Sequence, residues 1–260
     1  MTSNKEPSVA ELMELAAEAV KNKNMAVAVA YWRQAAKKGE LNAYLNIGLH
    51  YARLCVAEEH EQTKALYLQS ALSALEPIYP PDYGRPQASL YMGTLAEHWA
   101  MFKLRTARAD EELLAVHDFF ARAAECYAVA TGMEDYQGGM YPQTAMNALA
   151  ALHEKGVGVD KNMEKAYALR LQAAQDGFWE AQINVAVMKY RGEGTERSAS
   201  EAGGWLRKAI SQIPEDNPLK REATEFLGII EAEGNPGPSR AGIGTVPQAL
   251  IQLGTKTPTL

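Results

Sequence analysis

Two glycines separated by one residue, Gly156 and Gly158, have the spacing of a loop that could cradle a phosphate. A phosphate-binding loop follows a strand, precedes a helix and points its backbone amides at the ligand. Here the glycines follow a segment of helical periodicity, and no Lys-Ser or Lys-Thr pair comes after them. The same spacing recurs at Gly192 and Gly194. We therefore interpret both glycine pairs as turns between helices.

Histidine and cysteine side chains are the next candidates for chemistry. None of the five histidines forms an HExxH motif or lies at metal-ligand spacing from Cys55 or Cys126. A Cys/His nucleophile pair that is close only in space stays open, although no local motif supports it. The sequence predicts no catalytic residue, no metal and no cofactor, so we expect the chain not to be an enzyme. The enzymatic alternative is a hydrolase or transferase built on a helical scaffold.

Composition limits the partners and the compartment. The 260 residues are 47% apolar and carry a formal net charge of -6, which makes the chain a poor general binder of nucleic acid or of an anionic membrane. The N-terminus lacks the pattern of a signal peptide. No run approaches the about 18 to 20 apolar residues of a membrane span. We therefore expect a cytoplasmic protein without a nucleic-acid or membrane partner.

Internal repeats organise the chain. Residues 145–180 and 181–216 align without a gap at an offset of 36 residues, and a fixed period of this size is typical of stacked helical hairpins. Ala145, Leu149 and Leu152 share one face of a first helix, while Ala166, Leu169 and the alanines at 173 and 174 share one face of a second. The spacing from Ala88 to Ala123 is seven residues longer than the equivalent spacing from Ala145 to Ala173. We expect helices near 8–21, 25–38, 41–56, 61–76, 86–104, 110–131, 142–155, 162–176, 179–191, 198–211 and 217–232.

This pattern resembles the Sel1-like repeat family, whose members are related to tetratricopeptide repeats. The resemblance rests on Ala145, Leu149, Gly156, Gly158, Ala166, Ala173, Ala174 and Gly177, on their counterparts from Ala181 onward, and on the stretch AYLNIGLHY at 43–51. It implies an all-α, right-handed α-solenoid of about five helix-turn-helix repeats over residues 1–233, clearest at 24–54 and 142–211. Residues 234–260 are rich in glycine and proline at their start and are predicted to be a flexible tail. Within this tail, VPQALIQLG could dock onto a partner or back onto the solenoid.

The resemblance implies a non-catalytic scaffold or adaptor that binds a protein or peptide in a concave groove. A cytoplasmic immunity or chaperone-like protein for a secreted bacterial toxin or effector, and a regulator that senses a ligand or peptide, are the alternatives.

The resemblance also implies which residues line the groove: the third, seventh, tenth and eleventh of each first helix. The eleventh residues are all basic or able to become so, and they would suit an acidic and apolar peptide. Cations near the end of a helix also complement the helix dipole without any ligand. The candidate groove residues are Arg53, Leu49, His98, Glu97, Leu90, Lys155, Asn147, Arg191 and Tyr190.

Overall fold

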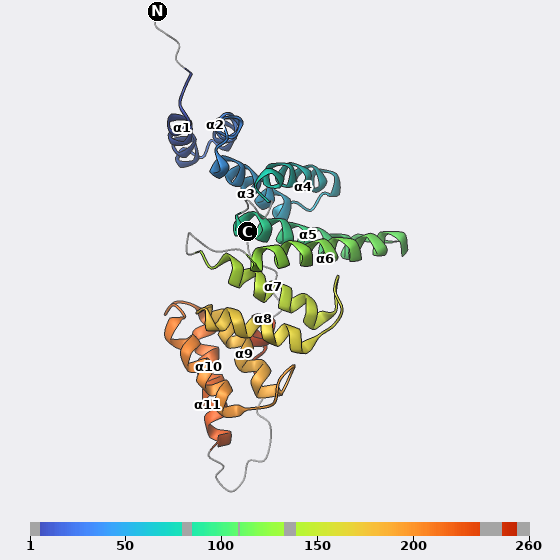
Figure 1. Ribbon diagram of the computed structural model, residues 1–260, viewed down its shortest axis with the longest axis vertical. Coiled ribbons are helices and arrows are strands. Elements are labelled where there is room, and N and C mark those ends of the chain that lie inside the picture. The colour runs from blue at the N-terminus through green and yellow to red at the C-terminus, as the bar shows by residue number, and fades with distance from the viewer. Residues whose placement is uncertain (1–5, 80–84, 109, 133–138, 235–245, 254–260) are drawn as a thin grey trace, which may run out of the picture. The chain divides into compact units, whose positions relative to one another are not determined.

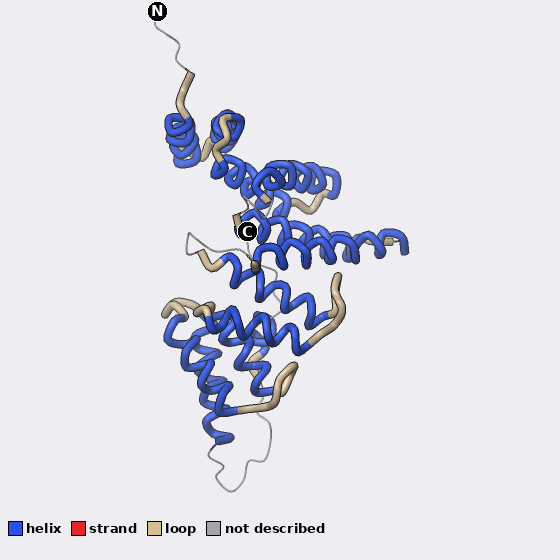
Figure 2. Tube along the Cα trace, viewed as in Figure 1, coloured by secondary structure: helices blue, strands red, loops and turns tan. Residues whose placement is uncertain are grey.

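The structure, a computed structural model, describes residues 6–79, 85–108, 110–132, 139–234 and 246–253. This part of the chain holds twelve α-helices, one short 3-10 turn and no strand (Figures 1 and 2). All eleven predicted helices form, each with ends within two residues of the expected position. The elements are α1 (Val9–Lys21), α2 (Met25–Lys37), α3 (Leu41–Ala57), α4 (Glu61–Leu75), η1 (Glu76–Ile78), α5 (Pro86–Thr106), α6 (Asp110–Thr131), α7 (Tyr141–Lys155), α8 (Met163–Gln175), α9 (Trp179–Arg191), α10 (Ala199–Gln212), α11 (Pro218–Gly234) and α12 (Gln248–Leu253).

The chain divides into two compact units, and the boundary falls inside α5, between Leu95 and Ala96. In the first unit, α1 packs against α2, α2 against α3, and α3 against α4. In the second unit, each helix from α6 to α11 packs against the next one, and α12 packs against α9 and α11. Both units are therefore built from successive helical hairpins. The predicted extent of one array over residues 1–233 stays a prediction.

The seven-residue insertion lengthens two helices. Helices α5 and α6 have 21 and 22 residues, against 15 and 13 in α7 and α8. In the second unit, Trp99 of α5 meets Phe119 of α6 edge to face, with ring centroids 6.2 Å apart. The hydroxyl of Tyr127 in α6 donates a 2.9 Å hydrogen bond to Glu97 of α5. The insertion thus extends a helical hairpin and does not form a separate loop domain.

Several helices start at a side chain that satisfies a backbone N–H group left over by the first turn. Ser8 and Glu11 form a reciprocal capping box at the start of α1. Asn162 and Ser198 lie 36 residues apart and cap α8 and α10, accepting from the backbone N–H three residues ahead at 2.8 and 3.2 Å. The 36-residue repeat therefore includes the capping residue at the start of the second helix of both hairpins.

The glycine pairs form the turns between the two helices of a hairpin. Gly156 ends α7 with a left-handed backbone (φ 68°), a conformation that side chains with a Cβ avoid. Gly158 also has a positive φ, and a Cβ there would overlap the backbone of Phe120 in α6. At the equivalent Gly194, a Cβ would overlap the backbone of Met163 at the start of α8. The second glycine of each pair thus lets the turn lie directly on a helix of the preceding hairpin.

Alanines form much of the core where helices cross closely. In the first unit, Ala28, Ala35 and Ala43 are fully buried beside larger side chains such as Leu12 and Trp32. In the second unit the same role falls to alanines of the 36-residue repeat, because a small side chain lets two helix axes approach. The fully buried repeat alanines are Ala145, Ala166, Ala173, Ala181, Ala202 and Ala209.

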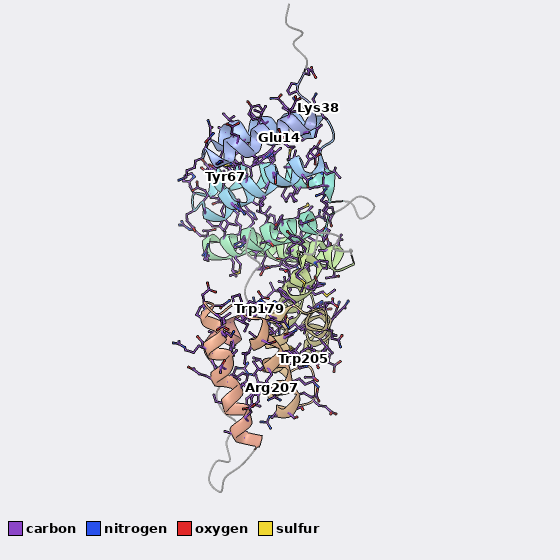
Figure 3. All side chains as sticks on the ribbon, turned by 90° about the vertical axis from the view of Figure 1, so that its left-hand side faces the viewer. Glu14, Lys38, Tyr67, Trp179, Trp205 and Arg207 are labelled. Carbon is purple, nitrogen blue, oxygen red and sulfur yellow. The ribbon has the colours of Figure 1, made fainter. Side chains whose placement is uncertain are left out.

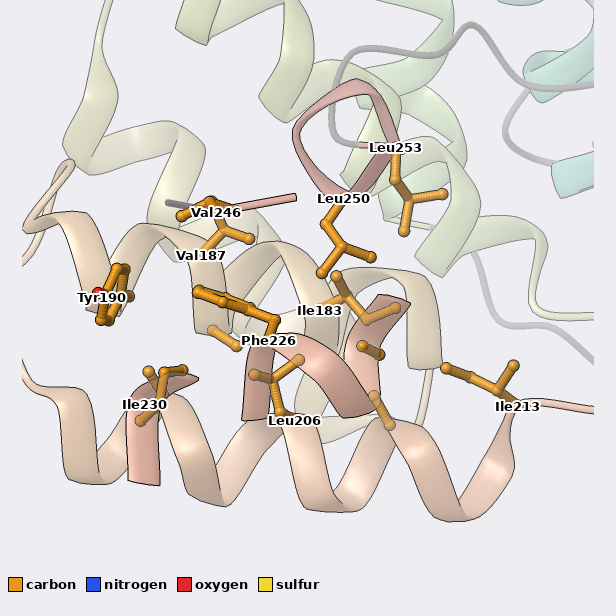
Figure 4. Close-up of a cluster of buried hydrophobic side chains, with 14 residues drawn as sticks. Ile183, Val187, Tyr190, Leu206, Ile213, Phe226, Ile230, Val246, Leu250 and Leu253 are labelled. Carbon is orange, nitrogen blue, oxygen red and sulfur yellow. The ribbon is translucent and has the colours of Figure 1, made fainter. Parts of the chain in front are cut away.

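The last cluster of the second unit includes a segment from the predicted tail. Val246, Leu250 and Leu253 are buried at 6%, 1% and 8% exposure against α9, α10 and α11. Figure 4 shows Leu250 and Leu253 directed toward Ile183 of α9, with Val246 beside Val187. Leu250 and Leu253 are spaced i and i+3 in α12, which gathers them on one face of this helix, and Val246 lies two residues before the helix begins. Residues 246–253 thus lie back on the repeats, one of the two alternatives stated for VPQALIQLG; residues 235–245 and 254–260 lie outside the described residues.

Candidate protein-binding surfaces

The four eleventh-position residues predicted to line the groove lie on four first helices. Arg53 of α3, Lys155 of α7 and Arg191 of α9 are exposed, and His98 of α5 is half-buried. Lys155 and Arg191 stand in the last turn of their helices, where the helix dipole favours a cation. Helix α3 continues four residues past Arg53, to Ala57, and α5 continues eight past His98, to Thr106. The dipole therefore accounts for two of the four positions.

The surroundings of these cations differ. Arg191 forms a 3.5 Å ion pair with Glu193 in the turn that follows α9. Arg53 lies close enough to His50 to lower the pKa of that imidazole, although burial is the larger cause of the shift. Arg53 belongs to the first unit and the other three residues to the second.

Lys155 lines an open hollow of about 760 Å³ where α7 ends and α8 begins. Lys161 and Lys165 line it as well, and all three lysines are exposed. We call the hollow lined by these lysines, together with His117, His153 and Asp160, the basic hollow. The Nδ1 atom of the buried His153 lies 3.1 Å from the carbonyl oxygen of Asp160, which ties the turn to α7.

Lys161 and Lys165 were missed from the sequence, because the prediction used positions on first helices only. The signal was present as three lysines within eleven residues on both sides of the glycine turn. A turn that reverses the chain between two helices brings such residues together at one end of the hairpin.

Three predicted groove residues prove to be buried. Leu90 and Glu97 of α5 are each 4% exposed, and Tyr190 of α9 is fully buried. They are therefore not exposed on a groove, contrary to the prediction. Helix α5 is covered almost all round between residues 86 and 97, and such a helix has no free face.

Specific partners explain two of these burials. Glu97 accepts the hydrogen bond from the Tyr127 hydroxyl. The ring of Tyr190 meets Phe226 of α11 edge to face at 5.1 Å, and its hydroxyl donates to Glu233 of α11. Both side chains therefore join neighbouring helices within the second unit.

The remaining two candidates are half-buried. Leu49 lies on α3 in the first unit. Asn147 of α7 accepts a 2.8 Å hydrogen bond from the side-chain amide of Asn184 in α9. Asn147 thus links two successive first helices, and it keeps some surface for a partner.

A buried ion pair joins α7 to α8, and its carboxylate residue, Glu154, directly precedes Lys155 of the basic hollow. One guanidinium nitrogen of Arg170 donates to Glu154 at 2.7 Å, and the other lies 3.3 Å from the sulfur of Met188 in α9. The Arg170 side chain is 2% exposed and that of Glu154 is 26% exposed. A buried charge is tolerated only when it is paired and hydrogen-bonded, so this pair fixes the relation of three helices.

Charged side chains on α10 already have protein partners. Arg207 pairs with Glu231 of α11 at 2.7 Å, and the ammonium of Lys208 lies 4.4 Å from the centre of the Trp205 ring. Figure 3 labels Trp205 and Arg207 on this helix. These contacts are intramolecular, so we do not include α10 in the candidate surface.

The thiols and histidines do not assemble into a recognisable reactive group. Cys55 and Cys126 are both buried and unpaired with each other, and burial raises the pKa of the Cys55 thiol to about 11 against a smaller opposing effect of Lys64. A thiol with a raised pKa is a poor nucleophile at neutral pH. Among the described residues, no three His, Cys, Asp or Glu side chains come together in a way that could hold a metal ion.

Comparisons with known proteins agree with this architecture. The family model described as Sel1 repeat matches residues 19–40, 143–178 and 179–212. The crystal structure of a Sel1 repeat protein from Oxalobacter formigenes is similar over 87% of this chain and 89% of that chain, with 17% sequence identity and a TM-score of 0.58. A protective antigen of uropathogenic Escherichia coli with an SLR fold shares 16% identity and a TM-score of 0.45 over 95% of this chain, which spans 51% of the antigen. No curated protein matches the sequence.

The fold thus belongs to the all-α solenoid class, which is built from helix-turn-helix repeats, as predicted. The chain carries Sel1-like repeats, which confirms the resemblance stated from the sequence. Sel1 repeat proteins generally mediate protein–protein interactions, and their fold is typically a non-catalytic scaffold. Within the described ranges, no helix combines the length and apolar character needed to cross a bilayer.

Proposed function

We propose that this chain is a non-catalytic scaffold that binds a protein partner through its first helices, and that an acidic segment of the partner enters the basic hollow. The observation that carries the proposal is the gathering of Lys155, Lys161 and Lys165 around one hollow in a chain of net charge -6. A local concentration of cations on an acidic protein attracts negative charge to one place, and it steers association more than it adds affinity.

The hollow has dimensions and chemistry that suit a peptide chain. It is open to solvent and has a volume of about 760 Å³. Its three lysines exceed the single carboxylate of Asp160. Lysine is a flexible point charge, which suits aspartate and glutamate side chains of varied geometry better than one fixed small molecule. Lys155 belongs both to the hollow and to the predicted groove of α7, so a bound peptide could continue from one to the other.

A comparison of two charge-reversed variants tests the proposal. The first changes Lys155, Lys161 and Lys165 to Glu. The control changes three other exposed lysines, Lys21, Lys23 and Lys37 in the first unit, to Glu and so alters the net charge equally. Far-UV circular dichroism establishes that both variants keep the helix content of the wild type.

Each chain is used to capture partners from a lysate, and the captured protein is identified and then tested in purified form. We expect the same acidic partner on the wild type and the control, and its loss from the Lys155, Lys161 and Lys165 variant. Binding should also weaken as ionic strength rises toward about 1 M, where the screening length falls to about 3 Å. Equal binding of the purified partner to both variants would show that the basic hollow is not the binding site.

A further inference from the structure

The C-terminal segment packs on residues that the repeat pattern assigns to a groove. Ile183, Val187 and Tyr190 are the third, seventh and tenth residues of the first helix α9, counted from Ala181. All three belong to the buried cluster that contains Val246, Leu250 and Leu253. Figure 4 shows the apolar side chains of α12 directed at this face of α9 and at Phe226 of α11. Two of the expected groove positions of this repeat, Ile183 and Val187, thus lie beside residues 246–253 of the same chain, and Tyr190 lies against α11.

The floor under α12 is built by other helices. Eleven of the fourteen buried residues in the cluster come from α9, α10, α11 and the residue after α10, and three come from residues 246–253. Leu206, Phe226 and Ile230 are buried within this floor at 0%, 0% and 4% exposure. The floor therefore has its own packing, and removal of α12 would leave an apolar face across α9 and α11.

The covering segment has the form of a helical ligand. Helix α12 has two buried anchors at i and i+3, Leu250 and Leu253, a spacing found in amphipathic helices bound in a groove, and Val246 adds a third apolar contact just before the helix. Gln248 and Gln252, on the opposite side, are exposed, and residues 246–253 carry no charged side chain. The groove thus accepts an uncharged helix with aliphatic anchors.

A covering segment of this size is held only by its contacts. Helix α12 has six residues, well below the about 12 to 15 at which an isolated helix becomes marginally stable. Residues 235–245 join it to α11 and include three glycines and two prolines. A covalent connection of this length raises the local concentration of the segment to the order of millimolar, which can hold a weakly bound helix in place.

We propose that the face of α9 and α11 beneath α12 is a binding site for a short amphipathic helix of a partner protein, with aliphatic side chains at i and i+3 and a further aliphatic residue just before the helix. The chain's own residues 246–253 occupy this site when the partner is absent. A partner helix with additional anchors displaces them, because it makes the same contacts and more. The proposal does not depend on the basic hollow, which lies at the junction of α7 and α8.

A labelled peptide tests the site directly. The probe is a fluorescent peptide of residues 244–255, and its binding to the full chain is followed by fluorescence anisotropy. In one variant Leu250 and Leu253 are changed to Glu, which disables the covering segment and leaves the floor unchanged. In the control, Gln248→Glu and Gln252→Glu introduce the same charge at exposed positions of α12.

We expect the peptide to bind the leucine variant at least about tenfold more tightly than the wild type or the control, because the tethered segment no longer competes. A peptide carrying the same two Leu→Glu changes should not bind. If the peptide fails to bind a leucine variant whose circular dichroism matches the wild type, or binds all three chains equally, the proposal is wrong.

Hydrogen exchange on the wild-type chain covers the case in which the leucine variant does not fold. Reversible occupation predicts that the amides of α12 exchange at least about tenfold faster than those of α9 and α11, since the segment opens without unfolding its floor. If the α12 amides exchange at the rate of the α9 amides, residues 246–253 are a permanent part of the fold, and the proposal is overturned.

Discussion

The buried ion pair between Arg170 and Glu154 leads to a prediction about asymmetry. Glu154→Gln keeps the shape of the side chain but leaves a guanidinium that is 2% exposed beside a neutral amide. Removing one partner of a buried pair costs about 3 to 5 kcal/mol. We expect about 3 kcal/mol, the lower end, because Glu154 is 26% exposed and water can reach this side of the pair.

The opposite change should be milder. Arg170→Met leaves the Glu154 carboxylate, which is partly exposed and can be hydrated, and methionine replaces much of the arginine stem. We expect a loss of about 1 kcal/mol, in the range of a single net hydrogen bond. In the double variant Glu154→Gln/Arg170→Met no charge is left buried, so its stability should lie close to that of Arg170→Met alone.

Urea unfolding followed by far-UV circular dichroism measures these differences. For a slope of about 2 to 3 kcal/mol per molar urea, a 3 kcal/mol loss lowers the midpoint by about 1 M. The critical result is that Glu154→Gln should lower the free energy of unfolding by more than Arg170→Met does. If Arg170→Met were as destabilising as Glu154→Gln, the packing of the arginine stem, and not the burial of its charge, would explain the pair.

Three further predictions concern the turns and the buried groups of the first unit. Gly194→Ala should lower the melting temperature by more than Gly39→Ala, since both glycines have a positive φ but only at Gly194 would the new Cβ overlap backbone. Equal decreases in melting temperature would contradict the close approach of Gly194 to the backbone of Met163. Lys64→Met should cost about 2 to 3 kcal/mol in urea unfolding, because Lys64 is only 3% exposed and its ammonium donates to the carbonyls of Cys55 and Glu58 at 2.6 and 2.7 Å. An unchanged free energy of unfolding would show that water replaces the ammonium. The folded Cys55 thiol keeps its proton up to about pH 11, while the unfolded thiol ionises near 8.5, so the free energy of unfolding falls as pH rises through this window. In Cys55→Ala this decline of the free energy of unfolding should be shallower. An identical decline in both proteins would contradict the raised pKa.

Helix positions could be predicted from the sequence because the signals are local. The alanine periodicity, the caps at Asn162 and Ser198 and the left-handed Gly156 each act within a few residues of their own position. The 36-residue repeat then supplied independent support, since one hairpin predicts the next. The Sel1 resemblance rested on the alanines and glycines of this repeat, and the caps at Asn162 and Ser198 were found in the structure.

The candidate site was harder to predict because exposure depends on neighbours distant in sequence. Tyr190 was expected in an open groove, but Phe226 and Glu233 of α11 cover it. Leu90 was expected on a concave face, but α5 is surrounded by packing between residues 86 and 97. Nothing within α5 or α9 encodes what covers them, because a repeat pattern describes one hairpin and not the next layer.

The state of residues 246–253 also depends on neighbours distant in sequence, which here bury part of a segment that was predicted to be a flexible tail. Its sequence follows a stretch rich in glycine and proline and reads as a tail. Its helical state depends on Val246, Leu250 and Leu253 meeting a floor formed by α9, α10 and α11. A six-residue helix has too little local signal to be recognised apart from that floor.

The close seating of each glycine turn on the preceding hairpin has a consequence for how such a chain can change in length. Gly158 lies against Phe120 of α6, and Gly194 lies against Met163 of α8, so each of these two turns is fitted to the second helix of the preceding hairpin. A duplication of residues 145–180 would present the same helix start to the next glycine, and the added hairpin should be accommodated. A whole repeat of 36 residues is therefore a step by which this region can be lengthened with its turn contacts kept, both in gene duplication and in engineered arrays.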